Sequence, residues 1–171
     1  MALLIRLESK GAALFTQTRV GVAEKPFKIY KFRTMVPNAE ELKKDYEHLN
    51  ELKWPDFKIQ DDPRVTKVGK MLRKFSFDEL PQLMNVVKGD MSLVGPRPIS
   101  VPPENFNLWH TKRLEVIPGI TGIWQLEGRA SSYFDTRMRL DISYVEKRCL
   151  WLDIQILVRT IGSVFRQRGS F

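Results

Sequence analysis

The apolar residues of this 171-residue chain occur only in short runs, and this pattern constrains the fold more than any other feature of the sequence. The longest apolar stretch, 150–165, is interrupted by polar residues that include Asp153 and Arg159. The stretch at 1–5 ends at Arg6. Because a membrane-spanning helix needs about 20 consecutive apolar residues, we expect no such helix. The start is also too short for the apolar region of a signal peptide.

The chain is strongly basic, with 28 Lys and Arg against 20 Asp and Glu and a net charge of +8. Such a balance suits a nucleic acid, a phosphorylated small molecule or an anionic lipid surface, and charge alone does not choose among them. A solvated basic face without a specific partner is the alternative. The single cysteine, Cys149, excludes an internal disulfide. We expect it to pack in a helix as a small apolar residue.

Residues 13–34 have the pattern of a β-hairpin. Strands at 13–20 and 27–33 flank a turn at 21–26, which contains glycine and proline. Period-two alternation in the second strand places basic residues on both of its faces. This suits a strand that lines a charged cleft, or else an edge strand protected by lysines.

Helical spacing predominates in the rest of the chain. We expect a polar helix at 39–53, a basic amphipathic helix that starts at 61–63 and ends near 74, helices at 76–87, 104–114, 133–147 and 150–166, and extended segments at 91–94 and 118–124. The sequence contains neither an internal repeat nor a clear linker. It therefore predicts a single domain, 1–171, of mixed α/β (α+β) class, mostly helical with a short antiparallel β-hairpin.

Two adjacent carboxylates, Asp78 and Glu79, follow the candidate helix cap Ser76. Consecutive helical residues point about 100° apart, so the two carboxylates can take different roles beside one substrate. Free N–H groups at a helix N-terminus would lower the carboxylate pKa values. The alternative is structural, because Ser76 and Glu79 have the spacing of a capping box.

Basic residues from several segments accompany this acidic pair: Lys31, Arg33, Arg73, Arg97 and Arg129. Cations gathered around carboxylates suit a site that neutralises a diphosphate and holds a divalent ion. An aspartate can also act as a nucleophile toward phosphorus. Neither histidine has metal-ligand spacing, and the sequence has no Walker-type phosphate loop.

Six blocks of sequence resemble those of the bacterial sugar transferases, also called monotopic phosphoglycosyl transferases or polyprenyl-phosphate hexose-1-phosphate transferases. The blocks are KFRTM at 31–35, DPRVT at 62–66, SFDELPQL at 76–83, KGDMSLVGPRP at 88–98, PGITGIWQ at 118–125 and GR at 128–129. They occur in the family's order, and the resemblance covers about residues 5–171.

The resemblance implies transfer of a sugar-1-phosphate from a UDP-sugar to a polyprenyl phosphate, usually undecaprenyl phosphate, with Mg²⁺ and release of UMP. The product starts an exopolysaccharide, capsule, O-antigen or glycoprotein glycan. The family's catalytic Asp-Glu dyad falls on Asp78 and Glu79. Asp78 would attack the sugar-bearing phosphorus, form a phospho-sugar enzyme intermediate and lie against Mg²⁺, while Glu79 assists.

The same matching assigns basic residues to the substrate. Arg73 and Arg97 would clamp phosphates. The further pocket candidates are Arg19, Lys31, Arg33, Arg129 and Asp141. The sequence does not identify the donor sugar.

Family members also carry a hydrophobic helix that enters the membrane and returns on the same side. The chain begins near the end of that element, so we expect most of it to be missing. We expect the protein at the cytoplasmic face of the bacterial inner membrane, as a monomer or homodimer. The apolar residues of 151–165 suit either a bilayer surface or the domain core.

Two other functions remain alternatives. One is a catalytically silent membrane-surface protein that keeps the fold. The other is a basic nucleic-acid-binding module, although the sequence has no RNA- or DNA-binding signature and its basic residues are spread among segments.

Overall fold

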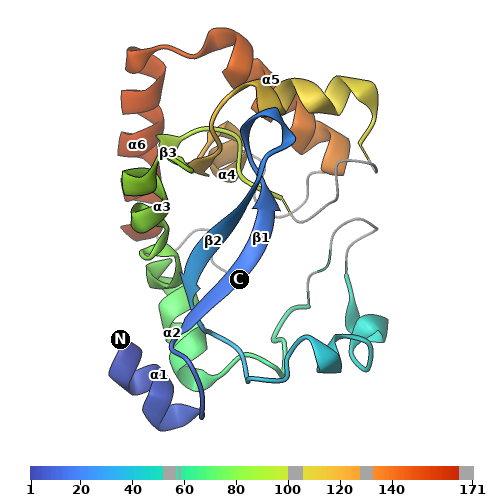
Figure 1. Cartoon of the computed structure of the whole chain (residues 1–171), viewed down its shortest axis with the longest axis vertical. Coiled ribbons are helices and arrows are strands. Elements are labelled where there is room, and N and C mark those ends of the chain that lie inside the picture. Colours follow the sequence, from blue (N-terminus) through green and yellow to red (C-terminus); the bar gives the residue numbers. More distant parts are fainter. Residues whose placement is uncertain (52–56, 58, 100–105, 128–132, 166–171) are drawn as a thin grey trace.

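An antiparallel β-hairpin lies at the centre of the molecule (Figure 1). The computed structural model describes residues 1–51, 57, 59–99, 106–127 and 133–165. Strands β1 (Leu14–Val20) and β2 (Pro26–Phe32) pair with Gln17 opposite Ile29, and a short 3₁₀ turn, η1 (Val22–Glu24), joins them. This pairing confirms the predicted hairpin. The hairpin was predictable because the alternation of residues within one strand is a local signal in the sequence.

The first two of three helices pack near the open end of the hairpin, and the third packs against the middle of β2. They are α1 (Ala2–Glu8), α2 (Lys67–Lys74) and α3 (Gln82–Lys88). A core cluster of Ile5, Ala13 and Leu72 joins α1, β1 and α2. Gly89, with φ of +80°, ends α3 at the predicted position.

The C-terminal part surrounds a second, parallel pair of strands. Strand β3 (Ser92–Val94) pairs with β4 (Gly119–Thr121), and a 3₁₀ helix, η6 (Leu108–Glu115), precedes β4. The two strands approach so closely that a Cβ on Gly119 would lie 2.1 Å from the Gly95 nitrogen. The sequence indicated both extended segments but not their pairing, which joins residues far apart in the chain.

Helices α4 (Ile123–Glu127), α5 (Phe134–Lys147) and α6 (Leu150–Phe165) complete the fold. Val94, Tyr144 and Ile156 form the second core cluster between them and β3. The expected helices at 133–147 and 150–166 are confirmed within the described residues, and so is the mixed, mostly helical class. The segment at 118–124 was expected to stay extended, but its last two residues begin α4.

The expected polar helix at 39–53 is wrong. The described part of this segment forms only two 3₁₀ turns, η2 (Glu41–Lys43) and η3 (Glu47–Leu49), and 52–53 lie outside the described residues. Most of these side chains are exposed, so the segment buries little apolar surface, and packing of an apolar face is what stabilises most helices in proteins.

The basic helix starts later than expected. Thr66, rather than 61–63, caps α2 by accepting a hydrogen bond from the Gly69 nitrogen at 3.0 Å. The Asp62 carboxylate is instead occupied by Arg64, whose Nη2 donates to Asp62 Oδ2 at 2.6 Å. The expected helix at 104–114 is also different, because its described part is 3₁₀. Cys149 is exposed between α5 and α6, not packed.

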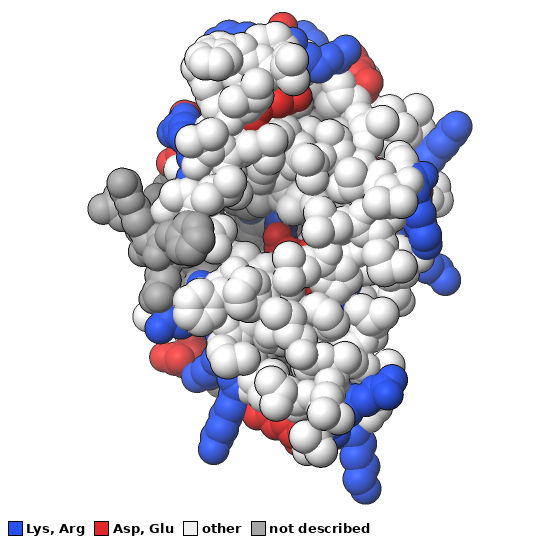
Figure 2. Space-filling model, turned by 90° about the vertical axis from the view of Figure 1, so that its left-hand side faces the viewer, with Lys and Arg blue, Asp and Glu red and all other residues white. Residues whose placement is uncertain are grey.

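Helices α1, α3 and α6 lie along the left edge of Figure 1, and the face seen from that side is mostly uncharged, with Lys and Arg mainly at its margins (Figure 2). We call this the apolar face. The three helices expose Leu3, Leu4, Leu7, Leu83, Met84, Val87, Trp151, Ile154, Val158 and Ile161. Helix α6 thus has two apolar sides, since Ile156 is buried in the core.

No helix within the described ranges is both long enough and apolar enough to cross a membrane.

Candidate active site

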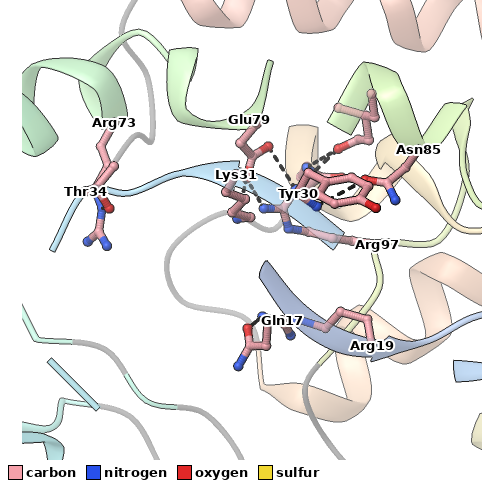
Figure 3. Close-up of polar contacts among 11 residues, drawn as sticks. Gln17, Arg19, Tyr30, Lys31, Thr34, Arg73, Glu79, Asn85 and Arg97 are labelled. Atoms are coloured by element: carbon pink, nitrogen blue, oxygen red, sulfur yellow. Dashed lines mark hydrogen bonds and ion pairs between the residues drawn. The ribbon is translucent and has the colours of Figure 1, made fainter. Parts of the chain in front are cut away.

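Glu79 lies between two basic side chains from different parts of the chain (Figure 3). Lys31 of β2 donates from Nζ to Glu79 Oε1 at 3.0 Å. Arg97 forms a bidentate pair, with Nη1 3.1 Å from Oε2 and Nη2 on Oε1. The exposed fractions of the Glu79, Lys31 and Arg97 side chains are 19%, 23% and 21%, so this three-residue network is largely shielded from water.

Asn85 of α3 fixes the strand that carries Lys31. Its Oδ1 accepts a hydrogen bond from the Tyr30 nitrogen at 3.1 Å, and its Nδ2 donates to the Lys28 carbonyl oxygen at 2.7 Å. The Asn85 side chain is fully buried and binds the edge of β2 that β1 leaves open. Helix α3 therefore sets the position of β2 next to Glu79.

The Ser76 capping box is wrong. Ser76 has a left-handed φ of +56° and makes no side-chain cap, while Glu79 turns toward Lys31 and Arg97. Asp78 and Glu79 lie in a 3₁₀ turn, η4 (Phe77–Glu79), separated from α3 because Pro81 has no N–H to continue the helical hydrogen bonds.

Asp78 is the unpartnered member of the acidic pair. Within the part of the chain that the structure describes, no group donates a hydrogen bond to its carboxylate or forms an ion pair with it. Burial and the adjacent Glu79 charge raise the pKa of Asp78, although Lys31, Arg73 and Arg97 act to lower it. The sequence predicted a lowered pKa from a helix N-terminus, which the structure does not place there.

Glu79 has the opposite electrostatics. Burial acts to raise its pKa, but the Arg97 and Lys31 charges and their hydrogen bonds outweigh burial and hold the pKa well below the usual range. Adjacent carboxylates thus differ in role: Glu79 is a fixed anion that orders two cations, while Asp78 has free oxygens beside those cations.

Two further arginines border this network. Arg73 of α2 donates from Nε to Thr34 Oγ1 at 3.0 Å, and burial lowers its pKa while Asp78 raises it. Arg19 of β1 donates from Nη2 to Gln17 Oε1 at 2.5 Å. Burial and the Arg97 charge lower the pKa of Arg19 to about 10, which indicates how much positive charge is concentrated here.

The other predicted site residues lie elsewhere. Arg33 donates to the Ser9 and Lys10 carbonyl oxygens at 2.7 and 2.6 Å and so caps the end of α1. Asp141 is buried in α5 and ion-paired with Arg113. Arg129 lies outside the described residues.

The site fits a divalent cation only with help from a substrate. Among the described residues, no group of three His, Cys, Asp or Glu side chains could hold a metal ion. Mg²⁺, however, is commonly bound by one or two carboxylates together with substrate phosphates. The free oxygens of Asp78 meet that requirement, while those of Glu79 are occupied.

The Lys31, Arg73 and Arg97 charges act on the free Asp78 carboxylate, and Arg19 interacts with Glu79. Such a group of cations suits phosphate groups, because guanidinium and ammonium groups are the usual phosphate ligands. Comparison with known proteins agrees. The family model for bacterial sugar transferases matches residues 1–167. The chain therefore belongs to the bacterial sugar transferase family.

Individual proteins with sugar-transferase or polysaccharide-production names are similar to the chain. The galactosyl transferase CpsE of Streptococcus agalactiae is 46% identical over 162 residues, which cover 94% of this chain and 36% of the relative. The undecaprenyl-phosphate galactose phosphotransferase of Salmonella typhimurium is 46% identical over 166 residues, 94% of this chain and 35% of the relative. The exopolysaccharide production protein ExoY of Sinorhizobium fredii is 38% identical, with 98% and 76% covered. The chain spans about a third of the length of the first two relatives.

Proposed function

We propose that this domain transfers a sugar-1-phosphate from a UDP-sugar to undecaprenyl phosphate and releases UMP, as the first step of a surface polysaccharide. The observation that carries the proposal is the free Asp78 carboxylate beside three cations, Lys31, Arg73 and Arg97. Glu79 orders two of them, Lys31 and Arg97. The names of relatives support the substrates, since one is an undecaprenyl-phosphate galactose phosphotransferase and another a UDP-N-acetylgalactosamine-undecaprenyl-phosphate N-acetylgalactosaminephosphotransferase.

In the proposed reaction, an Asp78 oxygen attacks the phosphorus that bears the sugar. The bond from this phosphorus to the bridging oxygen breaks, and that oxygen leaves with UMP. An acyl phosphate joins Asp78 to the sugar phosphate. An oxygen of undecaprenyl phosphate then attacks the same phosphorus, and Asp78 leaves as a carboxylate. The product is the lipid diphosphate sugar, and the enzyme is regenerated.

The surrounding residues would supply charge and alignment rather than protons. Displacement at a diphosphate depends mainly on neutralising the phosphate oxygens and on in-line positioning. Arg73, Arg97, Lys31 and Arg19 would bind those oxygens. Asp78 would also hold Mg²⁺, and the bound ion would neutralise diphosphate charge.

We propose that the apolar face rests on the cytoplasmic surface of the inner membrane, where the acceptor's phosphate lies. Leu7, Val87 and Trp151 are 74%, 90% and 66% exposed, from three separate helices. Large contiguous exposed apolar surfaces mark interaction sites. The basic margin of the face in Figure 2 suits anionic lipid headgroups. A second copy of the chain is the competing occupant.

The test is UMP release from a panel of UDP-sugars with Mg²⁺, with and without undecaprenyl phosphate in detergent. Lipid-dependent release from one donor is expected and would identify the sugar. Sedimentation with anionic liposomes tests the membrane contact, and the sedimentation coefficient without lipid tests for a dimer. Liposome binding without UMP release from any donor would contradict the transferase and favour a silent membrane-surface protein.

A further inference from the structure

A buried ion pair lies outside the site but reaches it through one hydrogen bond. Arg113 of η6 and Asp141 of α5 have exposed fractions of only 2% and 1%. Arg113 donates from Nε and Nη2 to Asp141 Oδ2, at 3.0 and 2.6 Å. The pair therefore fixes the Arg113 guanidinium in one orientation.

The second contact of Arg113 is to Arg97. Arg113 Nη2 also donates to the main-chain carbonyl oxygen of Arg97. Pro96 and Pro98 flank Arg97, so its main chain has little freedom of its own. On the other side, the Arg97 guanidinium donates to the Ile120 carbonyl oxygen at 3.3 Å as well as to Glu79. Arg97 is thus held at both its main chain and its side chain.

Stability alone is a weak reason for this arrangement. A buried ion pair loses the hydration of both charges, and apolar residues of similar volume often replace such pairs without loss of stability. Positioning is a better reason, because small displacements of a group that aligns substrate reduce rates steeply.

We propose that Arg113 is a positioning residue, which holds the main chain of Arg97 so that its guanidinium faces Glu79 and the substrate phosphates. Asp141 acts only through Arg113 and does not touch substrate. This inference rests on the proposed function, since Arg97 is placed there as a phosphate ligand.

The test is a double-mutant cycle on kcat/KM. The combined variant Arg113→Met, Asp141→Leu removes both charges and keeps the core filled. In the wild-type background we expect kcat/KM to fall about 10- to 100-fold, with Tm within a few degrees of wild type. In an Arg97→Ala background, the same two substitutions should lower kcat/KM less than twofold further, because the group they position is already absent.

A second ion pair between the same two helices, η6 and α5, provides a matched control. Lys112 and Glu146 form an exposed ion pair between η6 and α5, and Lys112 is the neighbour of Arg113 in the chain. Among the described residues, neither forms a hydrogen bond or an ion pair with Arg97. Lys112→Gln with Glu146→Gln should leave kcat/KM unchanged. In Arg113→Lys, the single ammonium group replaces a guanidinium that bonds both the Asp141 carboxylate and the Arg97 carbonyl oxygen. This variant should therefore keep part of the activity that the combined variant loses.

Equal losses in the wild-type and Arg97→Ala backgrounds would overturn the inference, and so would an unchanged kcat/KM in the combined variant. Failure of the proposed function is separate: it would be an absence of UMP release from the wild-type chain. In that case the same cycle is measured on UDP affinity by calorimetry. Equal losses of affinity in both backgrounds, or no loss, would again overturn the positioning role.

Discussion

Replacing Glu79 by glutamine tests the ion-pair network at its centre. The substitution removes one negative charge and turns an acceptor oxygen into an N–H₂ group that faces Lys31 or Arg97. At least one charge-assisted hydrogen bond is lost, each being worth about 1.5–3 kcal/mol. Because the three side chains are still about one-fifth exposed, water relieves part of the unpaired charge.

We therefore expect Glu79→Gln to lower the free energy of unfolding by about 2–3 kcal/mol at pH 7. For a chain of this size, that corresponds to a fall in Tm of roughly 5–10 °C. The measurement is thermal unfolding followed by circular dichroism. Glu127→Gln is the control, since its exposed pair with Arg159 at 3.3 Å should contribute almost nothing.

The effect of Glu79→Gln on stability should also depend on pH in a definite direction. The pKa of Glu79 is lowered by folding, so its stabilising contribution is complete above its unfolded pKa of about 4.5 and is lost as the pH falls below that value. The Tm difference between wild type and Glu79→Gln should be largest near pH 7 and shrink toward pH 3. A variant as stable as wild type at pH 7 would refute the reasoning. The free-energy cost of burying the Glu79 charge would then equal the stabilisation from its bonds to Lys31 and Arg97.

Three further predictions concern single residues. Arg73→Gln removes a cation that lowers the pKa of Asp78, so the acid limb of single-turnover UMP release should move to higher pH; an unmoved limb would count against Asp78 as the group that must ionise. Gly69→Ala places a Cβ 2.0 Å from the Thr34 carbonyl oxygen and should lower the free energy of unfolding by about 3 kcal/mol. Gly162→Ala meets nothing within 4 Å and should raise it by up to about 1 kcal/mol. Equal changes in Tm for the two variants would contradict this packing. Arg33→Met removes the cap of α1 and should lower Tm without changing KM for the donor, and a raised KM would return Arg33 to the pocket.

The sequence predicts those parts of the fold that depend on local patterns. The hairpin follows from alternation in two adjacent segments, and α5 and α6 follow from helical spacing with enough apolar residues to bury a face. The prediction of a polar helix at 39–53 was wrong because helical spacing of charges does not by itself produce a helix where little apolar surface is buried.

The candidate site also has residues that the sequence predicts and residues that only the structure reveals. The motifs indicate Asp78, Glu79 and the cations around them, and the structure brings Lys31 and Arg97 to Glu79. Asn85 and Arg113 were missed, because their roles arise from contacts over 55 and 16 residues that no local pattern encodes. The resemblance assigned Asp141 to the pocket, whereas the structure buries it in an ion pair with Arg113.

The most direct test of the account is the intact mass of the protein after incubation with its UDP-sugar donor and Mg²⁺ in the absence of lipid acceptor. The account predicts a mass increase of one sugar phosphate, located by peptide mapping on Asp78, removed by undecaprenyl phosphate and absent in a folded Asp78→Asn variant. A modification on another residue, or lipid-dependent UMP release by Asp78→Asn at the wild-type rate, would contradict it.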